Sequence, residues 1–138
     1  MITDYFRLEG KKALITGAGK GIGARIATAF AEMGADVALL ARTESDLDSV
    51  AREVTELSRE ALTFACDVTD EAALAGVVEK LTEHWGSLDI LVNNAGAPGQ
   101  GYGSLKKVTK ARFVNTLDIN LTSAYTLTHL ALPLLQAA

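Results

Sequence analysis

Four glycines at alternate positions, in the run Thr-Gly-Ala-Gly-Lys-Gly-Ile-Gly over residues 16–23, constrain this chain more than any other feature. The run follows a short apolar segment and precedes an amphipathic stretch that begins at Ile22. Glycine tolerates a positive φ without a Cβ penalty, so the pattern predicts a tight turn between a strand and a helix rather than a flexible loop. The first turn of a helix carries unpaired N–H groups and the positive end of the helix dipole. We therefore expect this turn to approach a phosphate group.

Short apolar runs alternate with amphipathic stretches along the rest of the chain. The apolar runs predict strands over residues 12–16, 36–41, 61–66 and 88–92. The first predicted helix, over residues 22–33, places its apolar stripe at Ile22, Ile26, Phe30 and Met33. Thr43 is the expected N-cap of the second helix. Crossovers of this length imply an α/β fold with a parallel sheet and helices on both of its faces.

The last third of the chain reads as a glycine-rich loop followed by one long helix. Residues 96–103 contain four glycines, too many for the loop to hold structure by itself, and we predict a mobile lid. Residues 109–132 predict a single helix that Pro133 then disturbs. This helix is apolar on two sides, so we expect the sheet to cover one side and another helix or subunit the other. Asn120 lies within its apolar stripe and should have hydrogen-bond partners.

Composition narrows the class of partner. The 138 residues are 49% hydrophobic, enough for a real core, and carry a formal net charge of −4 without a basic cluster. This balance argues against a nucleic-acid or anionic membrane surface and favours a small-molecule partner. Cys66 is alone and cannot form an intramolecular disulfide, and no signal peptide or membrane-length apolar run is visible, so we expect a cytoplasmic protein. His84 and His129 have no partner spacing typical of a metal site, and we expect no metal.

The register of the glycines indicates a particular family. The common fingerprint G-x-G-x-x-G fails from Gly17, whereas the relaxed form G-x-G-x-x-A fits Gly19, Gly21 and Ala24. Read as Thr-Gly-x-x-x-Gly-x-Gly, residues 16–23 resemble the short-chain dehydrogenase/reductase family, and Asn-Asn-Ala-Gly at residues 93–96 is similar to its second motif. The resemblance implies a Rossmann-type doubly wound parallel sheet. It covers residues 1–138 as one dinucleotide-binding domain, partial relative to the family because the pattern stops after the fourth strand and its long helix. The two-sided apolar helix and the unpaired sheet edge at the fourth strand separately predict a homo-oligomer.

The end of the second strand predicts which dinucleotide binds. A site for NAD usually has a carboxylate there, but this chain has Arg42, and Asp36 lies at the opposite end, ~16 Å away at ~3.3 Å per residue. Arg42 offers a planar fork of donors to a 2′-phosphate, and Lys20 adds a second positive charge. We therefore predict NADP(H) in preference to NAD(H). The expected cofactor-binding residues are Gly17, Gly19, Lys20, Gly21, Ile22, Gly23, Arg42, Thr43, Asp67, Val68, Asn93, Ala95 and Gly96.

Several of these positions also have a purely structural interpretation. Asp67 and Val68 look like the pair that meets the adenine in the family, but Asp67 could equally cap the following helix. Asn93, Ala95 and Gly96 would lie beside the riboses, although asparagine amides there can also tie neighbouring strands together.

The resemblance also implies a chemistry, and one part of its machinery is missing. Asn120 matches the family's active-site asparagine, which holds a water in a proton relay, with a backbone-bonded amide as the alternative. The family's serine and helical Tyr-x-x-x-Lys pair do not appear after a fifth strand, and the match at Tyr102 and Lys106 is a loop coincidence. We expect the cofactor-binding half of an NADP(H)-dependent oxidoreductase of carbonyl or alcohol substrates, inactive by itself. The alternative is a non-catalytic dinucleotide-binding or assembly module.

Overall fold

Four parallel strands form a single sheet at the centre of the molecule. A computed structural model describes residues 1–101 and 103–138. The strands, β1 (Lys12–Thr16), β2 (Asp36–Ala41), β3 (Ala61–Ala65) and β4 (Ile90–Val92), lie in the order β3-β2-β1-β4. On β1, Leu14 pairs with Ala38 of β2 on one side and with Leu91 of β4 on the other. The predicted parallel α/β sheet is confirmed.

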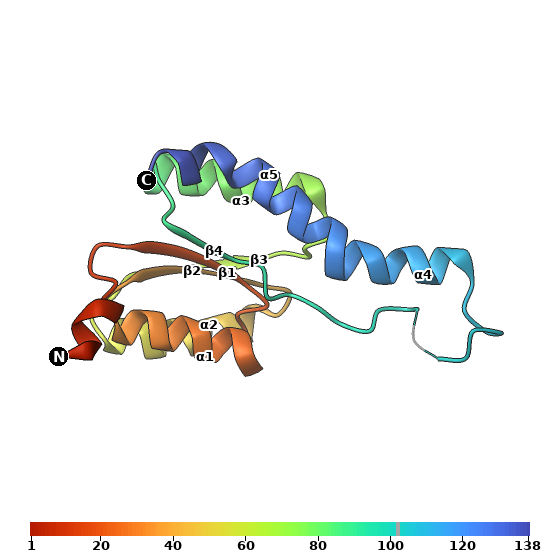
Figure 1. Cartoon of the computed structure of the whole chain (residues 1–138), viewed down its shortest axis with the longest axis horizontal. Helices are drawn as coiled ribbons and strands as arrows, with labels where there is room; N and C mark the ends of the chain where they lie inside the picture. Colours follow the sequence, from red (N-terminus) through yellow and green to blue (C-terminus); the bar gives the residue numbers. More distant parts are fainter. Residues whose placement is uncertain (102) are drawn as a thin grey trace.

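Helices cover both faces of this sheet (Figure 1). A short 3₁₀ segment, η1 (Ile2–Phe6), precedes β1. The helices α1 (Gly21–Glu32) and α2 (Glu44–Glu56) lie on one face, and α3 (Glu71–His84) and α5 (Ser123–Gln136) lie on the other (Figure 1). This is the doubly wound arrangement that repeated βαβ crossovers produce.

The predicted long helix exists, but its middle and its end differ from the prediction. It consists of α4 (Lys110–Leu117), a π-helical segment η2 (Asp118–Thr122) and α5. The expected end at Pro133 is wrong, because α5 continues through this proline. Leu134 is 3% exposed, and its carbonyl accepts a hydrogen bond from Leu88 N (3.0 Å). The packing of the last turn of α5 therefore stabilises the helix by more than is lost with the backbone hydrogen bond that Pro133 cannot donate.

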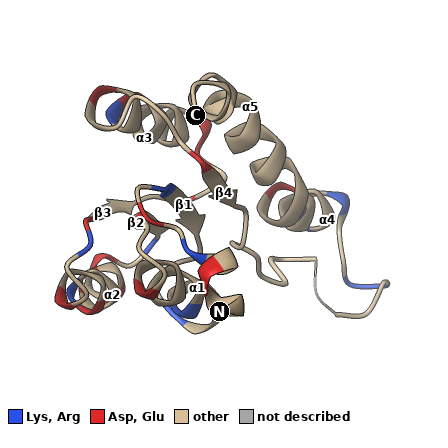
Figure 2. Cartoon of the chain, turned by 60° about the vertical axis from the view of Figure 1, so that its left-hand side comes forward, with Lys and Arg blue, Asp and Glu red and all other residues tan. Residues whose placement is uncertain are grey.

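The outer side of the long helix has no cover in the part of the chain that the structure describes. Leu121 and Tyr125 are 64% and 70% exposed, whereas Leu127 and Ala131 on the inner side are buried. The helix α5 carries no Lys, Arg, Asp or Glu (Figure 2). None of the described helices is both long and apolar enough to cross a membrane.

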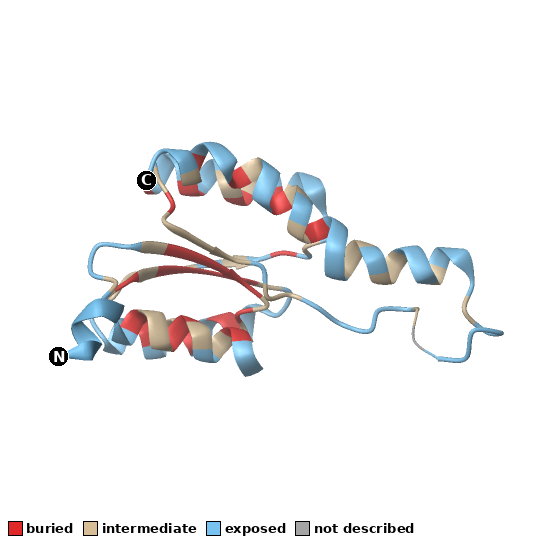
Figure 3. Cartoon of the chain, viewed as in Figure 1, coloured by how far each residue is buried: buried red, intermediate tan, exposed pale blue. Residues whose placement is uncertain are grey.

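Two hydrophobic clusters, one on each face of the sheet, form the core (Figure 3). Successive residues of a strand point to opposite faces. Ala13 and Ile15 of β1 accordingly belong to the cluster under α1 and α2, and Leu14 belongs to the cluster under α3 and α5. Both central strands are therefore buried on both faces, as expected for a parallel sheet.

The apolar stripe predicted for α1 is wrong in part. Ile22 is 74% exposed and Met33 is 37% exposed, whereas Ile26 and Phe30 pack at the edge of the cluster. The buried residues of α1 are Gly23, Ala27, Thr28 and Ala31. Gly23 lies so close to the strand-to-helix turn that no Cβ fits, and Ala27 and Ala31 pack into the cluster on the sheet. Neither close approach is visible in a hydrophobic pattern.

Candidate functional site

A cavity of about 840 Å³ opens where the glycine-rich turn, the carboxyl ends of the strands and the loop after β4 meet. Ten of the predicted residues line it: Gly17, Gly19, Lys20, Ile22, Arg42, Thr43, Asp67, Val68, Ala95 and Gly96. The sequence did not indicate a further set: Leu40, Ala41, Asp46, Cys66, Thr69, Asn94, Ala97, Pro98, Gly99, Gln100, Asn115 and Ile119. Gly21, Gly23, Asn93 and Asn120 are not part of the lining.

The glycine-rich turn presents bare backbone to this cavity. Gly17 and Gly21 have φ values of 63° and 60°, in the left-handed region that glycine tolerates best. A Cβ on Gly23 would overlap the Gly17 carbonyl and lie 2.6 Å from Asn94 Nδ2, so this position also requires glycine. Gly17 and Gly19 thus bring backbone without a Cβ to the lining, and Gly21 and Gly23 shape the turn behind them.

The first turn of α1 lacks a side-chain acceptor within the described residues. In contrast, Asp70 caps α3 by accepting from Ala73 N (3.0 Å), and Thr109 caps α4 by accepting from Arg112 N (3.2 Å). Free N–H groups at a helix start, next to a cavity and without covering side chains, suit an anion such as a pyrophosphate.

Asn94 joins the ends of β1 and β4. Its side-chain amide donates to the carbonyls of Thr16 (3.1 Å) and Gly17 (3.3 Å). In return, Thr16 Oγ1 accepts from the backbone N–H groups of Asn94 (3.0 Å) and Ala95 (2.9 Å). The two sequence motifs therefore hold each other in place. Asn94 was missed as a site residue, although its place in the second motif was a usable signal.

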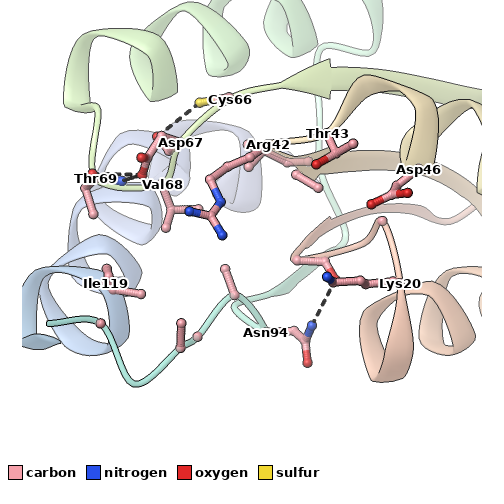
Figure 4. A pocket seen from close by; sticks show the side chains of 18 of the residues that line it. Lys20, Arg42, Thr43, Asp46, Cys66, Asp67, Val68, Thr69, Asn94 and Ile119 are labelled. Carbon is pink, nitrogen blue, oxygen red and sulfur yellow. Dashed lines mark hydrogen bonds between the residues drawn. The ribbon is translucent and has the colours of Figure 1, made fainter. Parts of the chain in front are cut away.

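Charged side chains enter the cavity from the ends of β2 and β3. The guanidinium of Arg42 points into it, on the side of Asp67 and Val68 (Figure 4). The carboxylate of Asp67 accepts from the backbone N–H (2.9 Å) and hydroxyl (2.8 Å) of Thr69. These bonds, helped by Arg42, hold the pKa of Asp67 below its usual value against a smaller effect of burial. Asp67 thus stays ionised, and its alternative role as a helix cap is wrong because Asp70 caps α3.

The thiol of Cys66 lies at the base of the same wall. Cys66 is 9% exposed, and its Sγ donates to the Asp67 carbonyl (3.3 Å). Burial, and then the negative charges of Asp70 and Asp67, raise the pKa of this thiol. Cys66 is therefore a neutral, buried residue in the wall of the cavity.

The loop after β4 is fixed by side chains of the long helix. Asn115 Oδ1 accepts from Gln100 N (3.0 Å), and Thr116 Oγ1 accepts from Gly101 N (2.8 Å) and donates to the Pro98 carbonyl (2.9 Å). Residues 96–101 are therefore held by contacts with the long helix, and the mobile lid stays a prediction. Tyr102 lies outside the described residues, so the structure does not test its spacing from Lys106.

Asn120 is at the centre of these contacts. Its Oδ1 accepts from Ala97 N (3.1 Å), and its Nδ2 donates to the carbonyls of Ala97 (2.6 Å) and Thr116 (2.9 Å). In a regular α-helix the Thr116 carbonyl would accept a hydrogen bond from the backbone N–H of Asn120. Here it accepts from the side-chain Nδ2 of Asn120, and the π-helical segment includes this residue. The expected hydrogen-bond partners are present, and they are backbone groups, but Asn120 is exposed and not buried.

Comparison with known proteins identifies the family. The sequence profile described as short chain dehydrogenase matches residues 11–138. An uncharacterized oxidoreductase of Mycobacterium tuberculosis is 40% identical over 135 residues, which are 98% of this chain and 51% of that protein. The chain belongs to the short-chain dehydrogenase family.

Solved structures of short-chain dehydrogenases share this fold. The L-sorbose reductase from Gluconobacter frateurii, complexed with NADPH and L-sorbose, superposes with a TM-score of 0.88 at 32% identity over 95% of this chain and 49% of that one. Carveol dehydrogenase from Mycobacterium avium, in complex with NAD, superposes with a TM-score of 0.86 at 33% identity over 94% and 50%. The chain thus spans about half the length of these relatives.

Four predicted site residues of this short-chain dehydrogenase chain lie behind or beside the cavity. Gly23 packs against the Gly17 carbonyl behind the turn, and Gly21 is the first residue of α1. Asn93 donates its side-chain amide to Thr128 Oγ1 (3.0 Å), which joins the end of β4 to α5. The predicted alternative, an amide that ties neighbouring strands, describes Asn94 instead. Asn120 does not line the cavity, but it bonds Ala97 of the loop that does.

Proposed function

We propose that this chain forms the cofactor-binding half of an NADP(H)-dependent oxidoreductase of carbonyl or alcohol substrates, with residues 1–138 as one dinucleotide-binding domain. The observation that carries the proposal is the guanidinium of Arg42 inside the cavity, with Lys20 in the same lining. The last two residues of β2, Leu40 and Ala41, supply no carboxylate there. Arginine binds phosphate through paired donors, so a 2′-phosphate fits this end of the cavity.

The cavity has complementary groups for the other parts of the dinucleotide. The free N–H groups at the start of α1, by Gly21 and Ile22, suit the pyrophosphate. The ionised Asp67 can accept from the amino group of the adenine, and Ala95 and Gly96 border the nicotinamide end. When bound, the nicotinamide supplies or accepts the hydride. Since one relative was solved with NADPH and another with NAD, cofactor preference depends on the side chains of each member.

We further propose that Asn120 acts in proton transfer only by positioning the loop at residues 96–101 and the waters beside it. Its amide N–H groups are both used by backbone carbonyls, and its oxygen accepts from Ala97 N, so the side chain is engaged in holding the loop. A proton donor adds typically about 10²–10⁴-fold to such a reaction. Residues 1–138 have no serine and Tyr-x-x-x-Lys pair set on a helix for this purpose. We therefore expect these residues alone to bind cofactor without turnover, as a binding module also would.

Arg42→Ala tests the cofactor preference. We expect NADPH binding to weaken by about 1.5–3 kcal/mol, the range for hydrogen bonds between charged groups, with little change for NADH. Nicotinamide fluorescence during titration measures both affinities. Arg52→Ala is the matched control, because Arg52 lies on the exposed side of α2 and bonds the Asp48 carbonyl. Equal affinities for NADPH and NADH in the unmodified chain would overturn the proposal.

A further inference from the structure

Asp46 brings a carboxylate to the cavity beside the glycine-rich turn that carries Lys20 and next to the end of β2, the strand that Arg42 follows. It lies in the first turn of α2, three residues after the N-cap Thr43. Both Asp46 and Thr43 line the cavity, and Figure 4 shows their side chains beside the glycine-rich turn that carries Lys20. The end of β2 has no carboxylate, but the next helix supplies one.

The position of Asp46 is fixed by close packing against the turn. A Cβ on Gly19 would lie 3.0 Å from Asp46 Cβ and 3.3 Å from Ala41 Cβ, both tighter than ordinary contact. The Asp46 Oδ2 atom would lie 3.8 Å from the same point, so the carboxylate is next to the backbone of the turn. Asp46 is half-buried, which limits the freedom of its side chain.

The carboxylate of Asp46 is not used by the fold. It forms no hydrogen bond or ion pair with residues 1–101 or 103–138, and α2 starts without a side-chain cap. Glu44 supplies another negative charge to the same helix start from an exposed position outside the lining. A half-buried acceptor without a partner inside a cavity is available to a ligand.

We propose that Asp46 is a specificity-determining residue that limits the preference for NADP(H); this inference rests on the proposed function. An ionised carboxylate accepts hydrogen bonds from ribose hydroxyls, but it repels a phosphate on the same ribose. Arg42 and Lys20 attract the 2′-phosphate, and Asp46 opposes them. The site therefore takes both dinucleotides, and the charge of Asp46 sets the ratio of their affinities.

Asp46→Asn removes the charge and keeps the shape. We expect NADPH to bind more tightly and NADH more weakly, so that the ratio of their dissociation constants changes by about fivefold or more in favour of NADPH. Asp48→Asn is the matched control, because Asp48 is on the same helix but is exposed and outside the lining. This variant should change the ratio of dissociation constants by less than about twofold. Asp46→Ser is a second variant that keeps a residue suited to a helix start.

Two nucleotides that lack the nicotinamide sharpen the test. Adenosine 2′,5′-bisphosphate and 5′-AMP differ only in the 2′-phosphate, and calorimetry with both should show the same change of ratio in Asp46→Asn. An unchanged ratio in folded variants that bind both dinucleotides would overturn the role of Asp46 and leave the proposed function intact. If the unmodified chain binds neither dinucleotide, the proposed function itself fails.

Discussion

The two glycine-rich segments, residues 16–23 and 96–101, border the same cavity but hold their shapes by different means. The first takes its shape from its own backbone, with positive φ values at Gly17 and Gly21 and with Gly23 packed against the Gly17 carbonyl, and Asn94 then ties it to the end of β4. The second is fixed over residues 96–101 by side chains of the long helix, from residues 15 to 23 positions further along the chain. A turn of the first kind is specified locally. A loop of the second kind depends on a distant element.

The largest effect should come from Gly23→Ala in the first segment. The new Cβ would overlap the Gly17 carbonyl and approach Asn94 Nδ2 to 2.6 Å, and neither neighbour is a flexible chain end. We expect the free energy of unfolding to fall by about 3 kcal/mol or more and cofactor binding to be lost. Urea denaturation measures the first quantity and fluorescence titration the second.

Gly76→Ala is the matched control for that variant. Gly76 lies inside α3, and a Cβ there meets nothing within 4 Å. Alanine should stabilise the helix by roughly 0.5–1 kcal/mol. If Gly23→Ala proves as harmless as Gly76→Ala, the first segment is not specified by its own backbone.

The second largest effect is expected on self-association through the long helix, residues 110–136, which holds the second glycine-rich segment. Its outer side is apolar and exposed, and we predict that two copies of the chain associate there. Leu132→Ser should weaken this association by about 1.5–3 kcal/mol, the value of burying one leucine. Sedimentation over a range of concentrations detects the change.

Leu57→Ser provides the control for association. Leu57 is 42% exposed at the end of α2, close to the 46% of Leu132, but it is remote from α5. A monodisperse monomer at high concentration in the unmodified chain would contradict the prediction.

A smaller and more local effect is expected from Thr116→Val. This change removes the bonds of Thr116 Oγ1 to Gly101 N and to the Pro98 carbonyl at nearly constant volume. The loop should open more easily by about 1–2 kcal/mol, while global stability changes less. Hydrogen exchange of the Gly101 amide reports the opening.

Thr55→Val separates the loop contact from a general effect of threonine in helices. Thr55 Oγ1 bonds only a carbonyl of its own helix, that of Arg52 (2.9 Å). An equal loss of Gly101 protection in both variants would show that Thr116 does not hold the second segment.

The smallest effect is expected at the opposite end of the sheet, remote from both segments. Burial raises the pKa of Glu60, but bonds from Trp85 and His84, with the charge of Lys12, outweigh it and lower the pKa below the usual 4.5. A lowered pKa means that this stabilisation is present above that value and is lost as the pH falls through the folded pKa. Glu60→Gln should therefore cost less than about 1 kcal/mol near neutral pH, and this cost should shrink as the pH falls below 4.5. A cost that persists in acid would point to packing instead of charge.

The strands and the glycine-rich turn could be predicted from the sequence because their determinants are local. Continuous apolar runs mark strands buried on both faces, and Arg42 follows directly after one of them. Asp46, Gln100 and Asn115 have no such mark, since only the packing of α2 on the turn and of the loop on the long helix brings them to the cavity. The interior face of α1 was misjudged for the same reason, because its buried residues are set by close packing on the turn at Gly23 and on the sheet at Ala27 and Ala31.

The alternation of β1 side chains between the two clusters has a consequence for unfolding. Leu14 packs in one hydrophobic cluster, and Ala13 and Ile15 pack in the other. If either helical layer separates from the sheet, it therefore exposes apolar side chains of a strand that also packs against the other layer. The sheet and both layers should therefore melt as one cooperative unit. In contrast, α4 contains no buried residue and can open by itself. The backbone amides of α4 should exchange hydrogen through local opening of low free energy, whereas those of β1 should exchange only on global unfolding.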